Sequence, residues 1–202
     1  MTESFFQRLS LSIMGGISIS VACICYMRVG GLAGAVLFAF GLLAVVHYGW
    51  KLYTGVSGFI KSRGELPGLA MILFGNILGC MLTATAMRFA LPGLSESAHT
   101  IFLTRIDHGW ARCLVLGIGC GFIMTTAVRF ARDGRYLPLL FGVPVFIMCG
   151  FLHSIADAFY LSMLPLQTLT ENATEIAALY LAIVAGNFLG CNLTRIITRQ
   201  PE

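Results

Sequence analysis

Two ionisable residues, His153 and Asp157, lie four positions apart in an otherwise apolar stretch of the chain. Imidazole gains or loses a proton in the physiological pH range, so a histidine that lines a pore could bind an anion or exchange a proton with it. If the segment is helical, both side chains lie on one face. A histidine bonded to a neighbouring helix would be purely structural. A metal site is the other alternative, but no third ligand has a suitable spacing.

A second polar group, Lys51 and Thr54, lies earlier in the chain, again within an apolar run. Lys51 either extends its ammonium group toward the membrane surface or supplies positive potential to an anion path. Thr54 can offer its hydroxyl from a loop that Gly55 permits, although threonine in a membrane helix more often bonds its own backbone. The apolar residues one to two helical turns before these polar centres either pack or form a constriction that excludes hydrated ions. They are Phe38, Leu42 and Phe146.

The composition excludes an ordinary water-soluble protein. Of the 202 residues, 57% are hydrophobic and 11% are charged, whereas soluble domains have about 25% charged residues. So much apolar sequence suffices for six membrane spans of roughly 20 residues each. The basic residues are scattered singly, so nucleic acid is not expected as a partner. The seven cysteines lie in apolar stretches without a Cys-x-x-Cys pair, so neither a metal nor a cofactor is expected.

Apolar runs bounded by charge, glycine or proline predict an all-α polytopic membrane protein, with residues 1–202 forming one transmembrane domain. Six spans place both termini on one side of the membrane. That side has eight lysines and arginines and the opposite side has four, with Lys51 left inside a span. Because basic residues favour the cytoplasmic side, we expect cytoplasmic termini. The predicted spans are residues 10–28, 32–60, 66–90, 109–132, 136–163 and 175–197.

A six-residue motif occurs in the third and again in the sixth predicted span, with five of six residues identical. It divides the domain into repeats of about 10–90 and 109–197, and three spans per repeat require opposite orientations in the membrane, as in many transporters. Glycines four positions apart, also found at Gly117 and Gly121, let helix backbones approach closely. The two copies are Gly75-Asn76-Ile77-Leu78-Gly79-Cys80 and Gly186-Asn187-Phe188-Leu189-Gly190-Cys191.

The second and fifth predicted spans are longer than a bilayer requires, and each has polar residues at its middle. We therefore expect both helices to be interrupted there. Interruptions at corresponding places in two inverted halves indicate a pathway at the membrane midplane. Backbone freed from a helix at that depth must be buried in protein or line water.

Four segments resemble the formate/nitrite transporter family. Gly150-Phe-Leu-His-Ser-Ile-Ala-Asp157 looks like the family's Gly-Phe-Glu-His-Ser-Ile-Ala-Asn, and Leu52-Tyr-Thr-Gly55 looks like its Leu-Phe-Thr-Gly loop. The repeated motif matches the Gly-Asn-x-x-Gly of its third and sixth helices. Gly117-Ile-Gly-Cys-Gly121 is similar to its Gly-Ile-Leu-Cys-Asn. The likeness runs in order along nearly the whole chain.

The resemblance implies a homopentamer of aquaporin-like protomers, each with its own pore for small monovalent anions such as formate, nitrite, hydrosulfide, acetate or lactate. It implies that His153 is the central pore histidine and that Thr54 is its partner in the interrupting loop. Arg105 falls where the family has a vestibule lysine that attracts anions. In the family's proposed mechanism, the anion gains a proton and crosses the constriction as the neutral acid. The constriction residues would be Phe38 and Leu42 on one side and Phe146 on the other, with Tyr53 beside them.

The sequence departs from the family pattern at four of these positions. Lys51 replaces an acidic loop residue, and Leu152 replaces the glutamate before the histidine. Gly121 replaces an asparagine and so removes a hydrogen-bond partner of His153. Asp157 also replaces an asparagine, and its carboxylate could raise the affinity of the histidine for a proton. The chain begins close to its first span, so the amphipathic N-terminal helix usual in the family is not expected.

These features predict a channel or proton-coupled transporter for small monovalent anions in a bacterial inner membrane, with protons and membrane lipid as further partners and no catalytic residue. A channel for small neutral solutes such as urea is one alternative, although aquaporin-type Asn-Pro-Ala pairs are absent from the sequence. An intramembrane enzyme with a metal at His153, Asp157 and His47 is another. The third is a structural subunit without a pore.

Overall fold

The computed structural model describes residues 4–198, and these residues form an all-helical fold, as the composition predicts. Four of the helices are long and apolar enough to cross a membrane. They are α1 (Phe5–Val29), α4 (Leu66–Ala90, preceded by the turn η2, Arg63–Glu65), α5 (Leu94–Arg132) and α9 (Ala173–Cys191). Two shorter apolar helices are α2 (Gly31–His47) and α6 (Leu137–Met148).

The second and fifth predicted spans are each interrupted. After α2, residues 48–52 lead into the short helix α3 (Tyr53–Val56) and the turn η1 (Ser57–Phe59). After α6, residues 149–153 lead into α7 (Ser154–Ser162). Each break contains a glycine with positive φ, 66° at Gly49 and 71° at Gly150, a conformation that strains residues with a Cβ atom.

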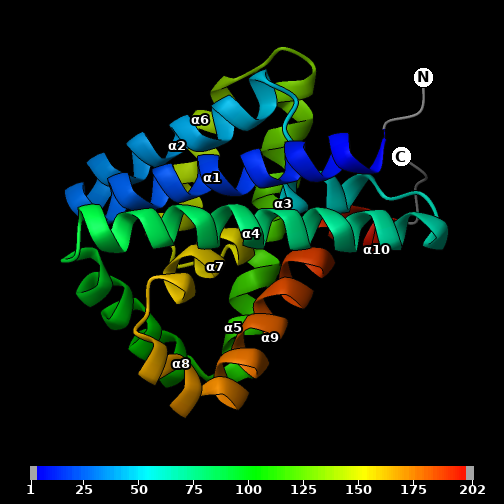
Figure 1. The fold of residues 1–202 in the computed structure, drawn as a ribbon. Helices are drawn as coiled ribbons and strands as arrows, with labels where there is room; N and C mark the ends of the chain where they lie inside the picture. The colour runs from blue at the N-terminus through cyan, green and yellow to red at the C-terminus, as the bar shows by residue number, and fades with distance from the viewer. Residues whose placement is uncertain (1–3, 199–202) are drawn as a thin grey trace.

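Helix α1 lies along α4, and α5 lies along α9 (Figure 1). Glycines make this close approach possible. A Cβ atom built on Gly79 would overlap the carbonyl oxygen of Ile13, and one built on Gly190 would overlap that of Ile118. Gly117 similarly faces Gly186 across the α5–α9 contact. The glycine motifs therefore place backbone directly against backbone.

The long helix α5 differs most from the predicted spans. It begins at Leu94, and the predicted start at residue 109 falls on a break inside it, where Gly109 has a φ of 64°. The segment before Gly109 is amphipathic: Leu94, Ala98 and Phe102 repeat every four residues and are buried in the core. A helix that packs one apolar face therefore occupies a region without a predicted span.

Three smaller differences concern helix ends. Helix α1 begins at Phe5, earlier than the predicted residue 10. The sixth span is divided, because α9 ends at Cys191 and α10 (Leu193–Thr198) follows Asn192. The short helix α8 (Leu166–Glu171) lies in the connection before α9.

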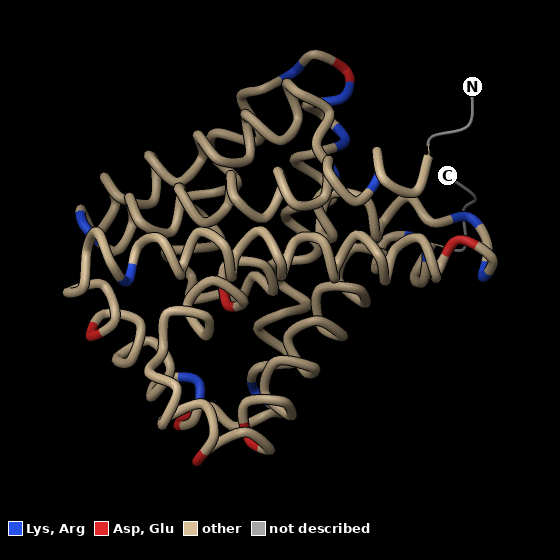
Figure 2. Tube along the Cα trace, viewed as in Figure 1, with Lys and Arg blue, Asp and Glu red and all other residues tan. Residues whose placement is uncertain are grey.

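Charged residues lie mainly at helix ends and in connections, and the middles of the long helices are largely uncharged (Figure 2). Large apolar side chains are exposed instead, for example Phe89, Phe141 and Phe40. An apolar exterior of this kind suits contact with lipid or with another protein rather than with water. The start of α1 and helix α10 lie at the same end of the molecule (Figure 1), where Arg8 and Arg195 both lie near Ile60.

Candidate functional site

Asn76 of α4 holds the first break in place. Its side chain is fully buried, and its Oδ1 accepts a hydrogen bond from the N–H of Tyr53 at 2.9 Å. Its Nδ2 donates to the carbonyl oxygens of Lys51 at 2.8 Å and of Ser12 at 2.7 Å. The amide thus satisfies the loop groups on both sides of Leu52, which would otherwise be buried without partners.

Asn187 of α9 does the same for the second break. Its Oδ1 accepts from the N–H of Ser154 at 2.8 Å, and its Nδ2 donates to the carbonyl oxygens of Leu152 at 2.8 Å and of Gly117 at 2.9 Å. The two copies of the repeated motif therefore have equivalent bonding. The residue between the two bonded loop groups is Leu52 in the first break and His153 in the second.

The breaks bring Thr54 and His153 together, although they are 99 residues apart in sequence. Thr54 Oγ1 lies 2.9 Å from His153 Nε2, and both side chains are buried. The other ring nitrogen, Nδ1, accepts the N–H of Ala156 at 3.2 Å, so His153 caps the N-terminus of α7. With Nδ1 accepting, a neutral ring has its proton on Nε2 and donates it to Thr54.

An apolar layer lies beside this pair. The rings of Phe38 and Phe146 meet edge to face with centroids 5.9 Å apart, and Phe146 stacks on the His153 ring at 5.8 Å. Leu42, one helical turn from Phe38, is also buried. Phe38 and Phe146 face one cavity and Leu42 faces another. Phe38 and Leu42, which lie one turn apart on α2, thus separate two cavities.

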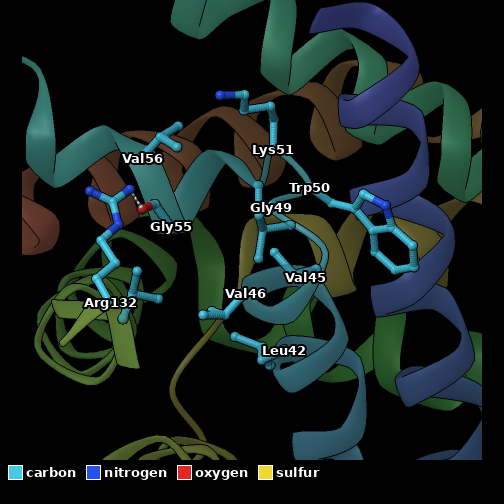
Figure 3. Close-up of a pocket in the computed structure, with 11 residues that line it drawn as sticks. Leu42, Val45, Val46, Gly49, Trp50, Lys51, Gly55, Val56 and Arg132 are labelled. Carbon is cyan, nitrogen blue, oxygen red and sulfur yellow. Dashed lines mark hydrogen bonds between the residues drawn. The ribbon is translucent and has the colours of Figure 1, made fainter. Parts of the chain in front are cut away.

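The first of these, the Arg132 cavity, has a volume of about 270 Å³. It lies between the end of α2, the first break, α3 and the end of α5. Lys51 and Arg132 are its two cationic lining residues. Figure 3 shows Arg132 extending toward the backbone of Gly55, and its Nη2 donates to that carbonyl oxygen at 3.3 Å. Arg132 is one of the eight basic residues assigned to the side of the termini, and nothing in the sequence indicated this contact.

The second, the His153 cavity, has a volume of about 160 Å³ and contains an ion pair. Arg105 Nε donates to Asp157 Oδ1 at 2.8 Å, while Asp157 Oδ2 is buried and has no hydrogen-bond partner among residues 4–198. His153 and Asp157 would share a helical face only if one helix contained both, but α7 begins after His153, and the Asp157 carboxylate bonds Arg105. The carboxylate of Asp157 also compensates the positive charge of Arg105.

Two further predicted residues lie away from the cavities. The hydroxyl of Tyr53 donates to the carbonyl oxygen of Val184 in α9 at 3.2 Å, and Tyr53 lines neither cavity. Gly121 faces the Asn187 carbonyl oxygen, which a Cβ atom would overlap, so this backbone has no room for a side chain that reaches His153. Within residues 4–198, no three histidine, cysteine, aspartate or glutamate side chains gather as metal ligands.

The family model of formate/nitrite transporters matches residues 1–198. The formate channel FocA of Haemophilus influenzae is 25% identical over 160 residues, covering 70% of this chain and 55% of that protein. FocA of Escherichia coli K12 is 24% identical, covering 76% of this chain and 64% of its own. A formate-nitrite transporter of Entamoeba histolytica is 24% identical, covering 80% and 54%. The chain thus spans between about half and two thirds of the length of these relatives.

Solved structures show the same fold. A pentameric formate channel with formate bound superposes with a TM-score of 0.80 at 21% identity, covering 96% of each chain. An FNT family ion channel gives a TM-score of 0.85 at 18% identity, covering 97% of this chain and 91% of the other. The match of the family model over almost the whole sequence confirms the resemblance seen in the motifs: the chain belongs to the formate/nitrite transporter family.

Proposed function

We propose that the protein is a channel or proton-coupled transporter for small monovalent anions such as formate, nitrite, hydrosulfide or short-chain carboxylates. One observation carries the proposal: two cavities face opposite sides of the Phe38, Leu42 and Phe146 layer, with the Thr54–His153 pair beside it. The family of the chain and its formate-channel relatives support the same function.

The apolar layer sets the chemical problem that transport must overcome. A bare anion pays a large desolvation cost among apolar side chains, whereas the neutral acid pays little. An anion that takes up a proton in the cavity can cross, and the proton leaves again on the far side. In the neutral ring, Nε2–H donates to Thr54 and Nδ1 accepts from Ala156, so His153 acts as an acid only after it has taken up a second proton. The imidazolium formed in this way and a water molecule are the two proton sources at this position.

The proposed assembly is a homopentamer with one pore per protomer, in a bacterial inner membrane. Each protomer has six membrane-spanning segments in two inverted repeats, about 10–90 and 109–197, with cytoplasmic termini. The pentameric relative supports the oligomer. The equivalent bonding of Asn76 and Asn187 supports the repeats, and the excess of basic residues on the terminal side supports the orientation.

The proposal is tested by flux measurements in proteoliposomes with formate, nitrite, hydrosulfide and acetate across a pH range. Anion flux is expected to rise as the pH falls, because more of the anion is protonated at the layer. His153→Ala is expected to change flux by about tenfold or to abolish its pH dependence. His99→Ala, an exposed histidine of α5, is the matched control. Unchanged flux and pH response in His153→Ala would remove this residue from the mechanism.

A channel for small neutral solutes is the second candidate. The observation that favours it is the Arg105–Asp157 pair, which leaves the His153 cavity without net charge. Urea in the same flux assay decides between the two. Urea flux without anion flux would replace the first proposal.

Phe146→Ala is expected to widen the constriction, because the Phe146 ring packs against both Phe38 and His153. The flux of lactate relative to formate should rise by about tenfold, since loss of the ring removes the main size limit. Phe141→Ala, an exposed aromatic residue of the same helix, should leave the ratio unchanged. An unaltered ratio in Phe146→Ala would show that the constriction lies elsewhere.

A further inference from the structure

Four cationic residues line a third cavity, which shares Arg132 with the Arg132 cavity. This basic cavity has a volume of about 690 Å³ and lies between η1 with the residues after it, the end of α5, and the start of α10. Its cationic residues are Lys61, Arg129, Arg132 and Arg195, and its remaining lining residues, Gly58, Phe59 and Ile60, are uncharged. An anion in the cavity would offset the mutual repulsion of these four charges.

Arg132 and Arg195 are held in position by groups that do not neutralise them. Arg195 donates to the Ile60 carbonyl oxygen and, at 2.7 Å, to Asn192 Oδ1. The Arg132 guanidinium lies 3.7 Å from the centre of the Phe59 ring, and that of Arg129 lies 5.7 Å away. Carbonyls, an amide and a ring orient Arg132 and Arg195 but leave the charge of these two residues available to a ligand.

The carboxylate of Glu65, four residues after Lys61, already accepts hydrogen bonds from its own turn. Glu65 Oε1 accepts from the backbone N–H groups of Lys61 and Ser62 and from the Ser62 hydroxyl, forming the cap of η2. Glu65 does not line the basic cavity. In the part of the chain that the structure describes, no carboxylate pairs with Lys61, Arg132 or Arg195.

Arg132 connects the basic cavity to the proposed pore. Its side chain lines both the basic cavity and the Arg132 cavity, and its Nη2 donates to the carbonyl oxygen of Gly55. Gly55 directly follows Thr54, whose hydroxyl contacts His153. A ligand that binds the guanidinium from the basic cavity competes with the contact that fixes the backbone beside Thr54.

We propose that Lys61, Arg129, Arg132 and Arg195 bind a phosphate group in the basic cavity, and that its occupancy changes flux through the Arg132–Gly55 contact. Arginine forks match phosphate oxygens in pairs, and basic pockets between membrane helices bind anionic head groups. A formate-sized anion fills only a small part of this volume. The phosphate comes either from an anionic phospholipid or from a free phosphate compound. The proposed effect on flux rests on the proposed transport function, whereas the proposed phosphate binding does not.

Binding is tested on the purified protein by thermal stability in detergent. Three probes are compared: inorganic pyrophosphate, a short-chain phosphatidylglycerol, and short-chain phosphatidylcholine as the zwitterionic control. We expect saturable stabilisation by pyrophosphate or phosphatidylglycerol, whichever is the source, and not by phosphatidylcholine. Lys61→Gln/Arg129→Gln, which changes two exposed side chains of the site, is expected to weaken this binding by about tenfold or more.

The control variant is Arg63→Gln/Arg135→Gln. It removes two positive charges from exposed residues that the sequence places on the same side of the membrane but that do not line the cavity. This variant should bind as the wild type does. If both double variants weakened phosphate binding equally, general electrostatic attraction would explain the effect and the proposed site would be overturned. The site would also be overturned if neither phosphate probe gave saturable stabilisation. The single substitution Lys61→Gln is also expected to weaken phosphate binding.

Regulation is tested by formate flux into phosphatidylcholine vesicles with and without the phosphate probe that binds. Flux should change at least about twofold in the wild type and in Arg63→Gln/Arg135→Gln, and not in Lys61→Gln/Arg129→Gln. Binding without a change in flux would overturn the proposed effect on flux. If no variant or wild-type protein transports any anion, the proposed function fails, and the stability measurements still decide the binding site.

Discussion

Replacing Asn187 by leucine is expected to lower the melting temperature of the purified protein by about 10 °C or more. The fully buried amide makes three hydrogen bonds to backbone groups of α5 and the second break. Leucine has a similar size but leaves the Ser154 N–H and the Leu152 and Gly117 carbonyls unpaired, at roughly 1–3 kcal/mol for each group. Each kcal/mol shifts the melting temperature of a chain of this length by roughly 2–4 °C.

The control for this prediction is Asn172→Leu. Asn172 is half-buried and bonds locally to the Thr168 carbonyl oxygen at 2.9 Å, away from both breaks. Its melting temperature should stay within about 3 °C of the wild type. Anion flux should fall only in Asn187→Leu, because this residue holds the loop that contains His153. Equal melting temperatures for the two variants would contradict the bracing role of Asn187.

Arg105→Leu is expected to reduce formate flux by about 100-fold. The substitution leaves the buried carboxylate of Asp157 without its ion-pair partner in the His153 cavity. An anion roughly 5 Å from that charge is repelled by about 3 kcal/mol at an effective dielectric constant of about 20. Breaking a buried ion pair from one side also destabilises a protein by roughly 3–5 kcal/mol. Flux in proteoliposomes and the melting temperature measure the two effects separately.

Two further variants test whether the unpaired charge of Asp157 causes the lower flux of Arg105→Leu. Arg105→Leu/Asp157→Leu removes both charges and should recover most of the stability that Arg105→Leu loses. Asp157→Asn leaves Arg105 charged and should raise anion flux relative to urea flux, because the cavity becomes net positive. If the double variant conducts no better than Arg105→Leu, repulsion by the Asp157 carboxylate is not what limits entry.

The sequence was most informative where a pattern depends on local chemistry. Hydropathy predicted the long apolar helices, since a span must be apolar along its length. Polar residues in the overlong second and fifth spans indicated where α2 and α6 are followed by breaks. The repeated motif identified Asn76 and Asn187, but as packing residues. Their hydrogen bonds to distant loop backbone leave no signal in side-chain type, so the bracing role became apparent only in the structure.

Long-range pairings could not be predicted in the same way. Arg105 and Asp157 are 52 residues apart, on α5 and α7, and spacing along one helix suggested His153 as the partner of Asp157 instead. That inference required a continuous helix, whereas the N-cap role of His153 ends the continuity. Arg132 contacts Gly55 across 77 residues, so counting it as a cytoplasmic charge concealed its place beside Thr54. The helix before Gly109 was missed because a short amphipathic segment is not long or apolar enough to register as a span.

Leu52 and His153 occupy equivalent positions between the backbone groups that Asn76 and Asn187 hold, yet one side chain is inert and the other ionisable. Such a pair is expected if the two proposed repeats arose by duplication of one unit, with the same backbone bracing kept and the side-chain chemistry changed. If the protein transports anions as proposed, substitutions at these two positions are expected to change the permeant species, while the Asn76 and Asn187 amides keep their bonds to backbone groups.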